Sequence, residues 1–235
     1  MSAPGQPANE EHRQVRFAAP PGATQILLIR HGESAPFQPD QPFSLVDGHG
    51  DPALHPNGVK QADRVGERLQ SEKIDAIYVT KLQRTHQTAA PLAAILGMTP
   101  VVDPDLHEVF LGDWEGGLVR QKVAELDPIY LQMQAEQDWG CIPNAESQAA
   151  LTTRCVRGIR RIAAAHTDQM VAVVVHGGVI GALLSFAAGS RGFAFNGADN
   201  GSIHHLVVNG DEWKIRCFND TSHLGRFTSE AQAPT

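Results

Sequence analysis

The sequence predicts a three-layer α/β/α sandwich with a mostly parallel central sheet. Three observations lead to this fold class. Short apolar runs alternate along the chain with segments of helical periodicity, as in strand–helix–strand units. The first three runs are continuously apolar, which is typical of strands covered on both faces. No linker divides the 235 residues into two differently patterned halves, so we expect a single domain over residues 24–225.

Apolar runs mark five strands. The three that we expect to be buried are residues 25–30 (QILLIR), 75–79 (DAIYV) and 171–175 (VAVVV). Residues 203–208 and 213–218 flank Asn209-Gly210, a pair that favours a tight hairpin turn. The pattern therefore predicts a hairpin that closes the sheet near the end of the domain.

Apolar residues at helical spacing mark the helices between these strands. One stripe follows Pro56, which suits a helix start, and a second ends at Gly97, a natural C-cap. Pro91 interrupts the second stripe, so a kink or a late start is expected there. Residues 178–188 are apolar nearly all round, which predicts a buried helix. The stripes are Val59, Ala62, Val65 and Leu69; Leu92, Ile95 and Leu96; and Leu151, Cys155, Ile159 and Ile162.

The composition excludes several kinds of protein. A net charge of −7 argues against broad nucleic-acid binding, which needs a basic face. No apolar run reaches the ~18 residues that cross a bilayer, and the N-terminus lacks the apolar core of a signal peptide. Cys141, Cys155 and Cys217 form no CxxC pair, and an odd number suits reduced thiols in the cytoplasm. Residues 1–23 and 226–235 are expected to be mobile tails.

Polar residues directly follow the three predicted buried strands. The segments are Arg30-His31-Gly32-Glu33-Ser34, Thr80-Lys81-Leu82-Gln83-Arg84 and His176-Gly177-Gly178. If the strands are neighbours, two histidines and two arginines meet at the sheet edge where ligands of parallel sheets bind. Arginine presents a fork of donors that matches phosphate oxygens, and a neutral imidazole can attack phosphorus. The glycines would let the backbone approach a ligand closely.

Six segments form an ordered set of motifs. They are LLIRHGES, DPALHPNGVKQA, TKLQRTHQTAA, DLHEVFLGDWEG, PNAESQAALTTR and VVVHGGVIGALL. RHG alone would be a weak signal, but the set covers residues 25–208. In this order the segments resemble the histidine phosphatase superfamily, the phosphoglycerate mutase-like enzymes. The resemblance implies a phosphoglycerate mutase-like fold with a small helical lid over about residues 105–150.

The resemblance also implies a role for each matching residue. His31 would be the nucleophile that becomes phosphohistidine, and Glu108 would protonate the leaving oxygen and then act as base toward water. Arg30, Arg84 and His176 would surround the phosphoryl group and neutralise its charge, so that neither a metal nor another cofactor is needed. The expected substrate-binding residues are Gly32, Glu33, Ser34, Phe37, Gln38 and Gly177.

Glu108 is not the only acid in its segment. Asp105, Asp113 and Glu115 are nearby carboxylates, and only the register of the family selects Glu108. Glu146 then matches the family's start of the following helix, although Ala145 precedes it where Gly is usual.

The family that the motifs resemble contains both mutases and phosphatases. Its mutase branch has a Tyr three residues beyond the catalytic Glu, where this chain has Leu111, and carries basic residues on the lid. Here Lys122 is the last basic residue before Arg154, and the acidic stretch between them would repel a bisphosphate. We therefore expect phosphomonoester hydrolysis. The alternatives are phosphoglycerate mutase-type transfer and a phosphate-binding module without turnover.

Segment 35–54 departs from the family pattern. Phe37 stands where many members have Asn, so a phosphate-contacting amide is missing or is supplied from elsewhere, with Gln38 as one source. The segment also contains Phe43 and no Lys or Arg. Our hypothesis is that it borders the leaving group and favours a small monophosphate with an uncharged or aromatic remainder. We expect no nucleic-acid or membrane partner; a homo-oligomer is compatible with the family.

Two groups of residues invite a metal-binding interpretation that we do not favour. His204 and His205 are adjacent in a predicted strand, so their side chains point to opposite faces. We expect one to face the core and the other the solvent. Four further residues of metal-ligand type are sparsely placed on a loop. We interpret them as turn and solvated residues, with contact to the substrate as the alternative. They are Asp47, His49, Asp51 and His55.

Overall fold

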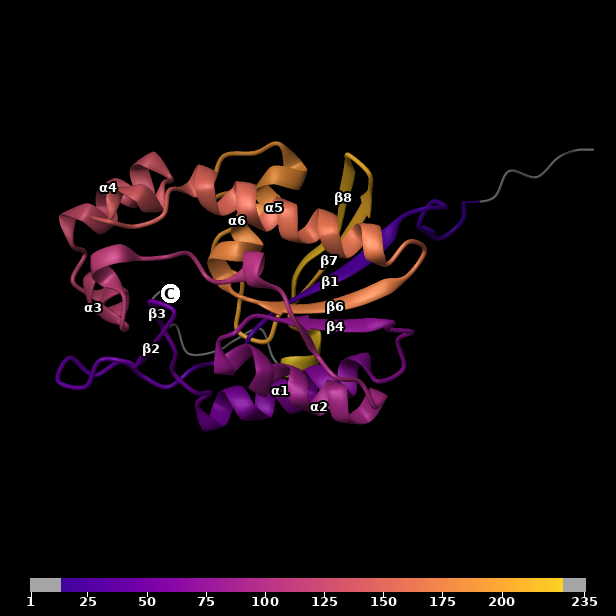
Figure 1. Cartoon of the computed structure of the whole chain (residues 1–235), viewed down its shortest axis with the longest axis horizontal. Coiled ribbons are helices and arrows are strands. Elements are labelled where there is room, and N and C mark those ends of the chain that lie inside the picture. The colour runs from indigo at the N-terminus through magenta and orange to yellow at the C-terminus, as the bar shows by residue number, and fades with distance from the viewer. Residues whose placement is uncertain (1–13, 226–235) are drawn as a thin grey trace, which may run out of the picture.

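The computed structural model describes residues 14–225, in which a central sheet carries helices on both faces (Figure 1). Of the expected mobile tails, residues 1–13 and 226–235 lie outside the described part. Residues 14–23 are described and contact the domain, because Arg216 lies over the ring of Phe17 and Gly22 N donates to Asp168 Oδ1 at 2.6 Å. Within the described part the sheet has six strands in the order β5-β4-β6-β1-β7-β8. The first four in this order are parallel, whereas β7 is antiparallel to β1, and β8 to β7. The predicted fold class is therefore confirmed. The strands are β1 Thr24–Arg30, β4 Ala76–Val79, β5 Val101–Val102, β6 Met170–Val175, β7 Ile203–Asn209 and β8 Glu212–Asp220.

Alternation along β1 divides the core into two layers. Leu27 and Ile29 belong to the apolar cluster under α1 and α2, and Ile26 and Leu28 to the cluster under α5 and α6. Successive strand residues point to opposite faces, so one strand contributes to both clusters. Figure 1 shows the two helix pairs on opposite sides of the sheet. The helices are α1 Pro56–Leu69, α2 Gln83–Leu96, α5 Gln148–Ala165 and α6 Gly177–Ala188.

Helix α1 begins at Pro56, as predicted, with His55 as its N-cap. Ala62, Val65 and Leu69 are buried, but Val59 is 50% exposed, so its inclusion in the buried stripe was wrong. The core-facing surface of α1 uses Gly58 and Gly66 instead. These glycines let neighbouring backbone come closer than a larger residue would allow.

Helix α2 ends as predicted, because Gly97 adopts the left-handed conformation (φ 65°) and caps its carbonyls. The late start that Pro91 suggested is wrong: α2 begins at Gln83 and includes Pro91. The predicted stripe of α5 is confirmed, since all four of its residues are buried. The predicted hairpin is formed by β7 and β8, but Asn209 pairs with Glu212, so the two-residue turn is Gly210-Asp211 rather than Asn209-Gly210. His204 is fully buried in β7, and His205 is half-buried.

The segment predicted as a lid has an apolar cluster of its own. Trp114, Met133 and Ile142 are buried together at its centre. Glu115 ties this segment to a small hairpin, because its carboxylate accepts from Gly50 N at 2.8 Å and from Leu111 N at 2.9 Å. Figure 1 places α3 (Leu118–Ala124), α4 (Pro128–Glu136) and the hairpin at one end of the molecule. The elements are η1 Pro104–Leu106, η2 Gly112–Trp114, α3 Leu118–Ala124, α4 Pro128–Glu136, η3 Trp139–Cys141, and the hairpin β2 Leu45–Val46 and β3 His49–Gly50.

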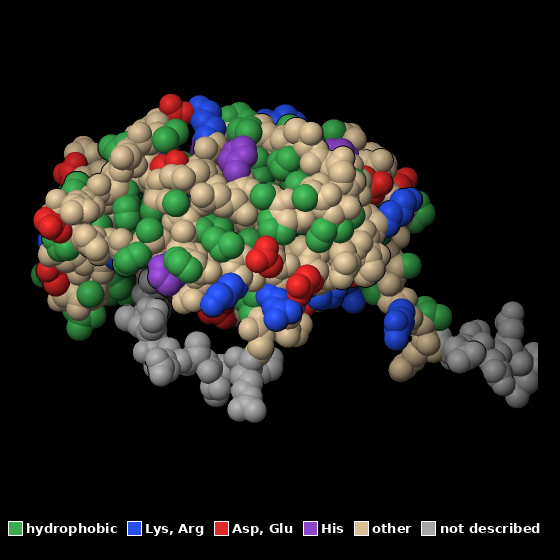
Figure 2. All heavy atoms as spheres, turned by 90° about the horizontal axis from the view of Figure 1, so that it is seen from below, with side chains coloured by type: hydrophobic (Ala, Val, Ile, Leu, Met, Phe, Trp, Pro, Cys, Tyr) green, Lys and Arg blue, Asp and Glu red, His purple; other side chains and the backbone are tan. Residues whose placement is uncertain are grey.

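The outer surface on the side of α1 and α2 is mixed in character. Figure 2 shows basic and acidic side chains interspersed there with apolar ones, rather than a basic patch over that face. None of the helices in residues 14–225 is both long and apolar enough to cross a bilayer.

Candidate active site

Three neighbouring strands bring the predicted polar segments together. β6 lies between β1 and β4 and is parallel to both, so the carboxyl ends of all three meet at one edge of the sheet. His31 N donates to the carbonyl of Val175 at 3.0 Å, directly beside His176. Two histidines and two arginines that are far apart in the sequence are thereby brought to one place, as the strand pattern predicted.

The loop that carries His31 is held by its neighbours' backbone and side chains. A Cβ on Gly32 would lie 2.4 Å from the carbonyl oxygen of Gly58, so glycine is needed there for α1 to approach. The close approach of a helix thus explains the need for glycine at position 32, and the contact of Gly32 with the substrate stays a prediction. Gly32 N donates to Thr88 Oγ1 at 3.0 Å, and Asn200 Nδ2 donates to the carbonyl of His31 at 2.9 Å.

The hydrogen bonds of His31 define its tautomer. Nδ1 lies 2.7 Å from the carbonyl oxygen of Gly32, and because a carbonyl only accepts, Nδ1 carries the proton. Nε2 therefore holds the lone pair and accepts from Nε of Arg84 at 3.2 Å. Burial lowers the pKa of His31 well below 6.5, and the charges of Arg84 and Arg30 add to this effect. The ring is neutral at neutral pH, with Nε2 as its nucleophilic atom.

Two arginines supply positive charge beside this atom. Arg84 is buried and donates from Nη1 to the carbonyl of Gly50 at 2.9 Å. Burial lowers its pKa to about 10, which still leaves the group charged at neutral pH. Arg30 donates to the carbonyl of Ala198, and a Cβ on Gly177 would lie 3.4 Å from its Nε. The predicted Gly177 thus lies against the guanidinium of Arg30.

His176 completes the basic cluster. Its ring meets the ring of His31 edge-on, with 5.2 Å between the centroids. Nε2 lies 3.0 Å from Thr80 Oγ1, whereas Nδ1 is buried without a hydrogen-bond partner among the described residues. Burial and then the charge of Arg84 lower the pKa of His176 well below 6.5. His176 directly precedes α6, whose N-terminus also favours an anion.

Glu108 lies in an irregular segment between η1 and η2. Its Oε1 accepts from Val109 N at 2.9 Å, and a Cβ on Gly178 would lie 2.6 Å from that oxygen. The carboxylate therefore rests on the first turn of α6, next to His176. The charge of Glu108 also acts to raise the pKa of both Arg30 and Arg84, although burial lowers both pKa values overall.

The other candidate carboxylates have different partners. Arg157 and Arg161 hold Asp105, and their hydrogen bonds lower the pKa of that carboxyl to about 2. Asp113 accepts from Asn144 Nδ2 at 3.0 Å. Glu115 accepts the two backbone N–H groups described above. These contacts favour Glu108 as the acid of the site.

The remaining predicted residues divide between the site and the surface. Ser34 is buried beside the His31 loop, and Glu33 is half-buried with its Oε1 3.6 Å from Nδ1 of His55. Phe37 packs edge-on against Phe43, with 5.9 Å between the centroids. Gln38 is exposed in a turn that Gln41 N closes by donating to its carbonyl. Phe37 and Gln38 both make contacts within the loop, and their contact with the substrate stays a prediction.

Sequence reasoning missed two basic side chains near the site, Arg120 and His107. It interpreted a third, His49, as a solvated loop residue, which is wrong because the His49 side chain is only 15% exposed. Arg120 reaches from α3 and donates to Ser34 Oγ and to the carbonyl of Ala35, both at 2.7 Å, with its guanidinium over the ring of Phe43. His49 and His107 face each other with 5.9 Å between their ring centroids. The pKa of His107 falls to about 4, first through burial and then through the charge of His49. A count of basic residues after Glu108 would have found Arg120.

The fold and the site together define a class of protein. Two arginines, two neutral buried histidines and a carboxylate at the carboxyl edge of a parallel sheet form a site suited to phosphate esters. Among residues 14–225, no group of three or more His, Cys, Asp and Glu side chains is arranged to hold a metal ion. The chain belongs to the histidine phosphatase superfamily: the model of its branch 1 matches residues 26–221. Members of this superfamily are phosphatases or mutases.

Known relatives extend over nearly the same residues. The chain is 34% identical over 204 residues to phosphoglycerate mutase-like protein 4 of Arabidopsis thaliana, which covers 85% of this chain and 86% of the relative. It is 33% identical over 207 residues to a metal-independent phosphoserine phosphatase of the same plant, covering 86% and 83%. A mycobacterial glucosyl-3-phosphoglycerate phosphatase has the same fold, with a TM-score of 0.72 at 24% identity over 85% of this chain and 100% of that one.

Proposed function

We propose that this protein is a metal-independent phosphatase that hydrolyses small phosphomonoesters through a phosphohistidine on Nε2 of His31. The lone pair of Nε2 attacks phosphorus while the bond to the ester oxygen breaks. The electron pair of that bond stays on the leaving oxygen, which takes a proton from Glu108. Water then attacks phosphorus and gives its proton to Glu108. The P–N bond breaks, its electron pair returns to Nε2, and inorganic phosphate is released.

The observation that carries this proposal is the hydrogen bond from Nδ1 of His31 to the carbonyl of Gly32. It leaves Nε2 unprotonated and aimed at Arg84. Because the pKa of His31 is depressed, the nucleophile needs no base to activate it at neutral pH. Arg30, Arg84 and His176 would then bind the phosphoryl oxygens and stabilise the charge that develops on them.

The choice of water rather than a second acceptor is part of the proposal. Leu111 stands where the mutase branch has Tyr, and Lys122 is engaged by Asp127 at 2.9 Å. Segment 35–54 has no Lys or Arg, and on that ground the sequence favoured a substrate with an uncharged or aromatic remainder. Arg120 changes this expectation, because it brings a positive charge to the edge of the segment. A remainder that carries a carboxylate, such as phosphoserine, is therefore proposed beside the aromatic remainder that the sequence favoured.

The test is phosphate release from p-nitrophenyl phosphate in the presence of EDTA, comparing the wild type with His31→Ala. We expect turnover by the wild type and none by the variant, with the folded state unchanged by circular dichroism. Acid-labile label from ³²P-substrate should be trapped on the wild type alone. Equal activity of the two proteins would refute His31 as the nucleophile. Transfer of the label to phosphoglycerate faster than to water would instead identify a mutase.

A further inference from the structure

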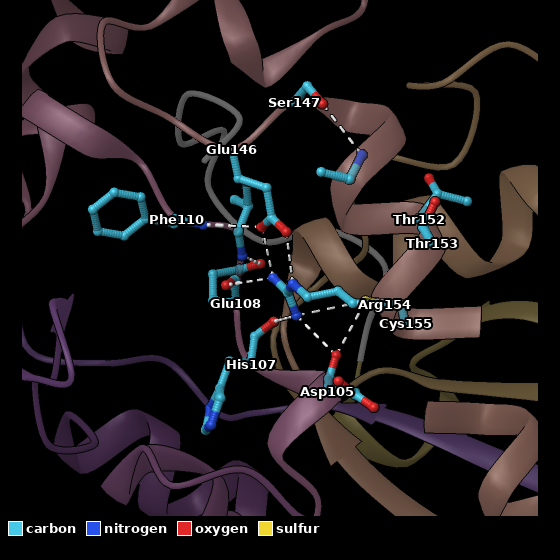
Figure 3. Close-up of polar contacts among 12 residues, drawn as sticks. Asp105, His107, Glu108, Phe110, Glu146, Ser147, Thr152, Thr153, Arg154 and Cys155 are labelled. Carbon is cyan, nitrogen blue, oxygen red and sulfur yellow. Dashed lines mark hydrogen bonds and ion pairs between the residues drawn. The ribbon is translucent and has the colours of Figure 1, made fainter. Parts of the chain in front are cut away.

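The guanidinium of Arg154, on α5, has a complete set of partners. Nε and Nη2 donate to the two carboxylate oxygens of Glu146 at 2.7 and 2.8 Å. Nη1 donates to the carbonyls of Asp105 and His107 at 2.9 and 2.7 Å, and Nη2 donates to the carbonyl of Glu108 at 2.9 Å. These bonds engage all five N–H donors that an arginine possesses. Figure 3 shows the side chain pointing from α5 into the backbone of the segment that carries Glu108.

Two of the three carbonyls, those of His107 and Glu108, belong to irregular backbone, and that of Asp105 lies in the short helix η1. Residues 107–111 form irregular backbone, and buried carbonyls of such a segment must find donors elsewhere. Arg154 supplies donors to the peptide group before Glu108, through the carbonyl of His107, and to the peptide group after it, through the carbonyl of Glu108 itself. Burial alone would lower the pKa of Arg154. The hydrogen bond and the charge of Glu146 outweigh burial and raise this pKa, so the guanidinium of Arg154 stays charged.

Glu146 secures the other side of the same segment. Its backbone N donates to the carbonyl of Phe110 at 2.9 Å, and its Oε2 accepts from Phe110 N at 3.4 Å. Glu146 and Arg154 together thus fix the backbone before and after Glu108. The carboxylate of Glu108 itself is held only by Val109 N and by contact with Gly178 among the described residues, so its direction depends on this backbone.

We propose that Arg154, oriented by Glu146, is a positioning residue that aims Glu108 at the leaving oxygen of the substrate; this inference rests on the proton-donor role in the proposed function. Proton transfer requires a heavy-atom distance of roughly 2.6–3.2 Å. A small shift of the segment would break that geometry without disturbing His31 or the arginines around it. Lysine cannot replace Arg154, because it has three donors on one atom instead of a planar fork of five.

The experiment compares kcat/KM over a series of substituted phenyl phosphates that differ in the acidity of the leaving phenol. Loss of a placed proton donor harms esters of weakly acidic phenols and spares p-nitrophenyl phosphate. For Arg154→Lys we expect a loss of at least about 10-fold on phenyl phosphate and under about 3-fold on p-nitrophenyl phosphate, since a placed donor contributes roughly 10²–10⁴-fold. Glu146→Gln keeps the shape of the side chain. It should therefore steepen the dependence of kcat/KM on the acidity of the leaving phenol less than Arg154→Lys does.

Arg161→Lys is the matched control. Arg161 lies seven residues further along α5 and binds the side chains of Asp103 and Asp105 rather than the carbonyls beside Glu108. Its substitution should leave the dependence on leaving-group acidity unchanged. If Arg154→Lys does not fold, as judged by circular dichroism, Glu146→Gln decides the question. A uniform loss over the whole series, or no loss, would overturn the proposal.

Glu108→Gln separates this inference from the proposed function. In one outcome, the dependence of kcat/KM on leaving-group acidity is steep in Glu108→Gln but equal to that of the wild type in Arg154→Lys. This outcome would leave the proposed function intact and reject the positioning role of Arg154. A wild-type dependence in Glu108→Gln would reject the proton donor itself, and the positioning role with it.

Discussion

At the scale of single residues, the chemistry of the site depends on keeping a histidine neutral beside cations. The backbone carbonyl of Gly32 fixes one tautomer of His31, and Arg84 occupies the side of the lone pair. Burial disfavours a protonated imidazole at this position, and the charges of Arg84 and Arg30 add to the effect, so the pKa of His31 is depressed.

This arrangement predicts how His31 titrates. Its folded pKa lies below 6.5, so the ring is neutral at pH 6.5 and above and becomes protonated only as the pH falls through the lowered value. Long-range ¹H–¹⁵N NMR spectra at pH 6 should show a neutral ring with the proton on Nδ1. A ring half-protonated at pH 6.5 or above, or one with its proton on Nε2, would contradict the geometry.

Sequence reasoning reached Arg30, His31, Arg84 and His176 because each stands within a few residues of the end of a buried strand. The parallel sheet then brings them together without further information. Arg120 and His107 were not reached, and His49 was interpreted as solvated, because these side chains come to the site through packing between segment 35–54 and the segment predicted as a lid. Such contacts depend on tertiary structure that leaves no periodic signal. The site residues that directly follow the strands were therefore predictable from the sequence. The site residues contributed by segment 35–54 and by the segment predicted as a lid were not.

At the scale of elements, α1 supports the loop that carries His31 through backbone contact. A Cβ on Gly58 would lie 2.0 Å from the carbonyl oxygen of Glu33, two residues after His31. Most of the apolar stripe of α1 was predicted correctly, but Val59 is exposed. The reason is that glycines take its place on the inner face of the helix. The face of this helix that meets the loop is lined by glycine, which a hydrophobic pattern does not register.

Two substitutions in α1 test this contact against each other. Gly58→Ala should destabilise the protein by more than about 4 kcal/mol, because the new methyl group meets rigid backbone. Gly66→Ala places its Cβ 3.1 Å from Cβ of Pro91, and the gain in helix propensity of about 1 kcal/mol offsets that crowding. Urea unfolding of both variants measures the difference. Similar stabilities for the two would show that α1 can move away from the loop at little cost.

At the scale of the whole molecule, the buried histidines couple folding to pH. His31, His107, His176 and His204 all have lowered pKa values in the folded state, to about 4 for His107 and about 3 for His204, in each case chiefly through burial. Below pH 6.5 these histidines are therefore protonated in the unfolded chain while they stay neutral in the folded chain. Stability is fully present above pH 6.5 and is lost as the pH falls from there toward the folded pKa values.

The expected slope is large enough to measure. Each fully buried histidine contributes up to about 1.4 kcal/mol of unfolding free energy per pH unit within this window. Urea unfolding at pH 7.5, 6.0 and 5.0 should show falling stability before the carboxylates of the unfolded chain titrate. His204→Asn should make the slope shallower by the equivalent of one proton. A free energy of unfolding that is flat between pH 7.5 and 5.0 would contradict the burial of these rings.

The bond from Asn200 to His31 joins residues 169 positions apart, and Gly201 N likewise donates to the carbonyl of Arg30. Loops closed over such distances form late in folding, because the chain entropy is lost before the contact is made. Asn200 is synthesised 169 residues after His31, so a growing chain exposes the loop of His31 long before this support exists. A chain without residue 200 therefore holds His31 without the hydrogen bond to its carbonyl. Under the proposed mechanism, phosphatase activity appears only after the segment around Asn200 has been made and has packed against the loop of His31.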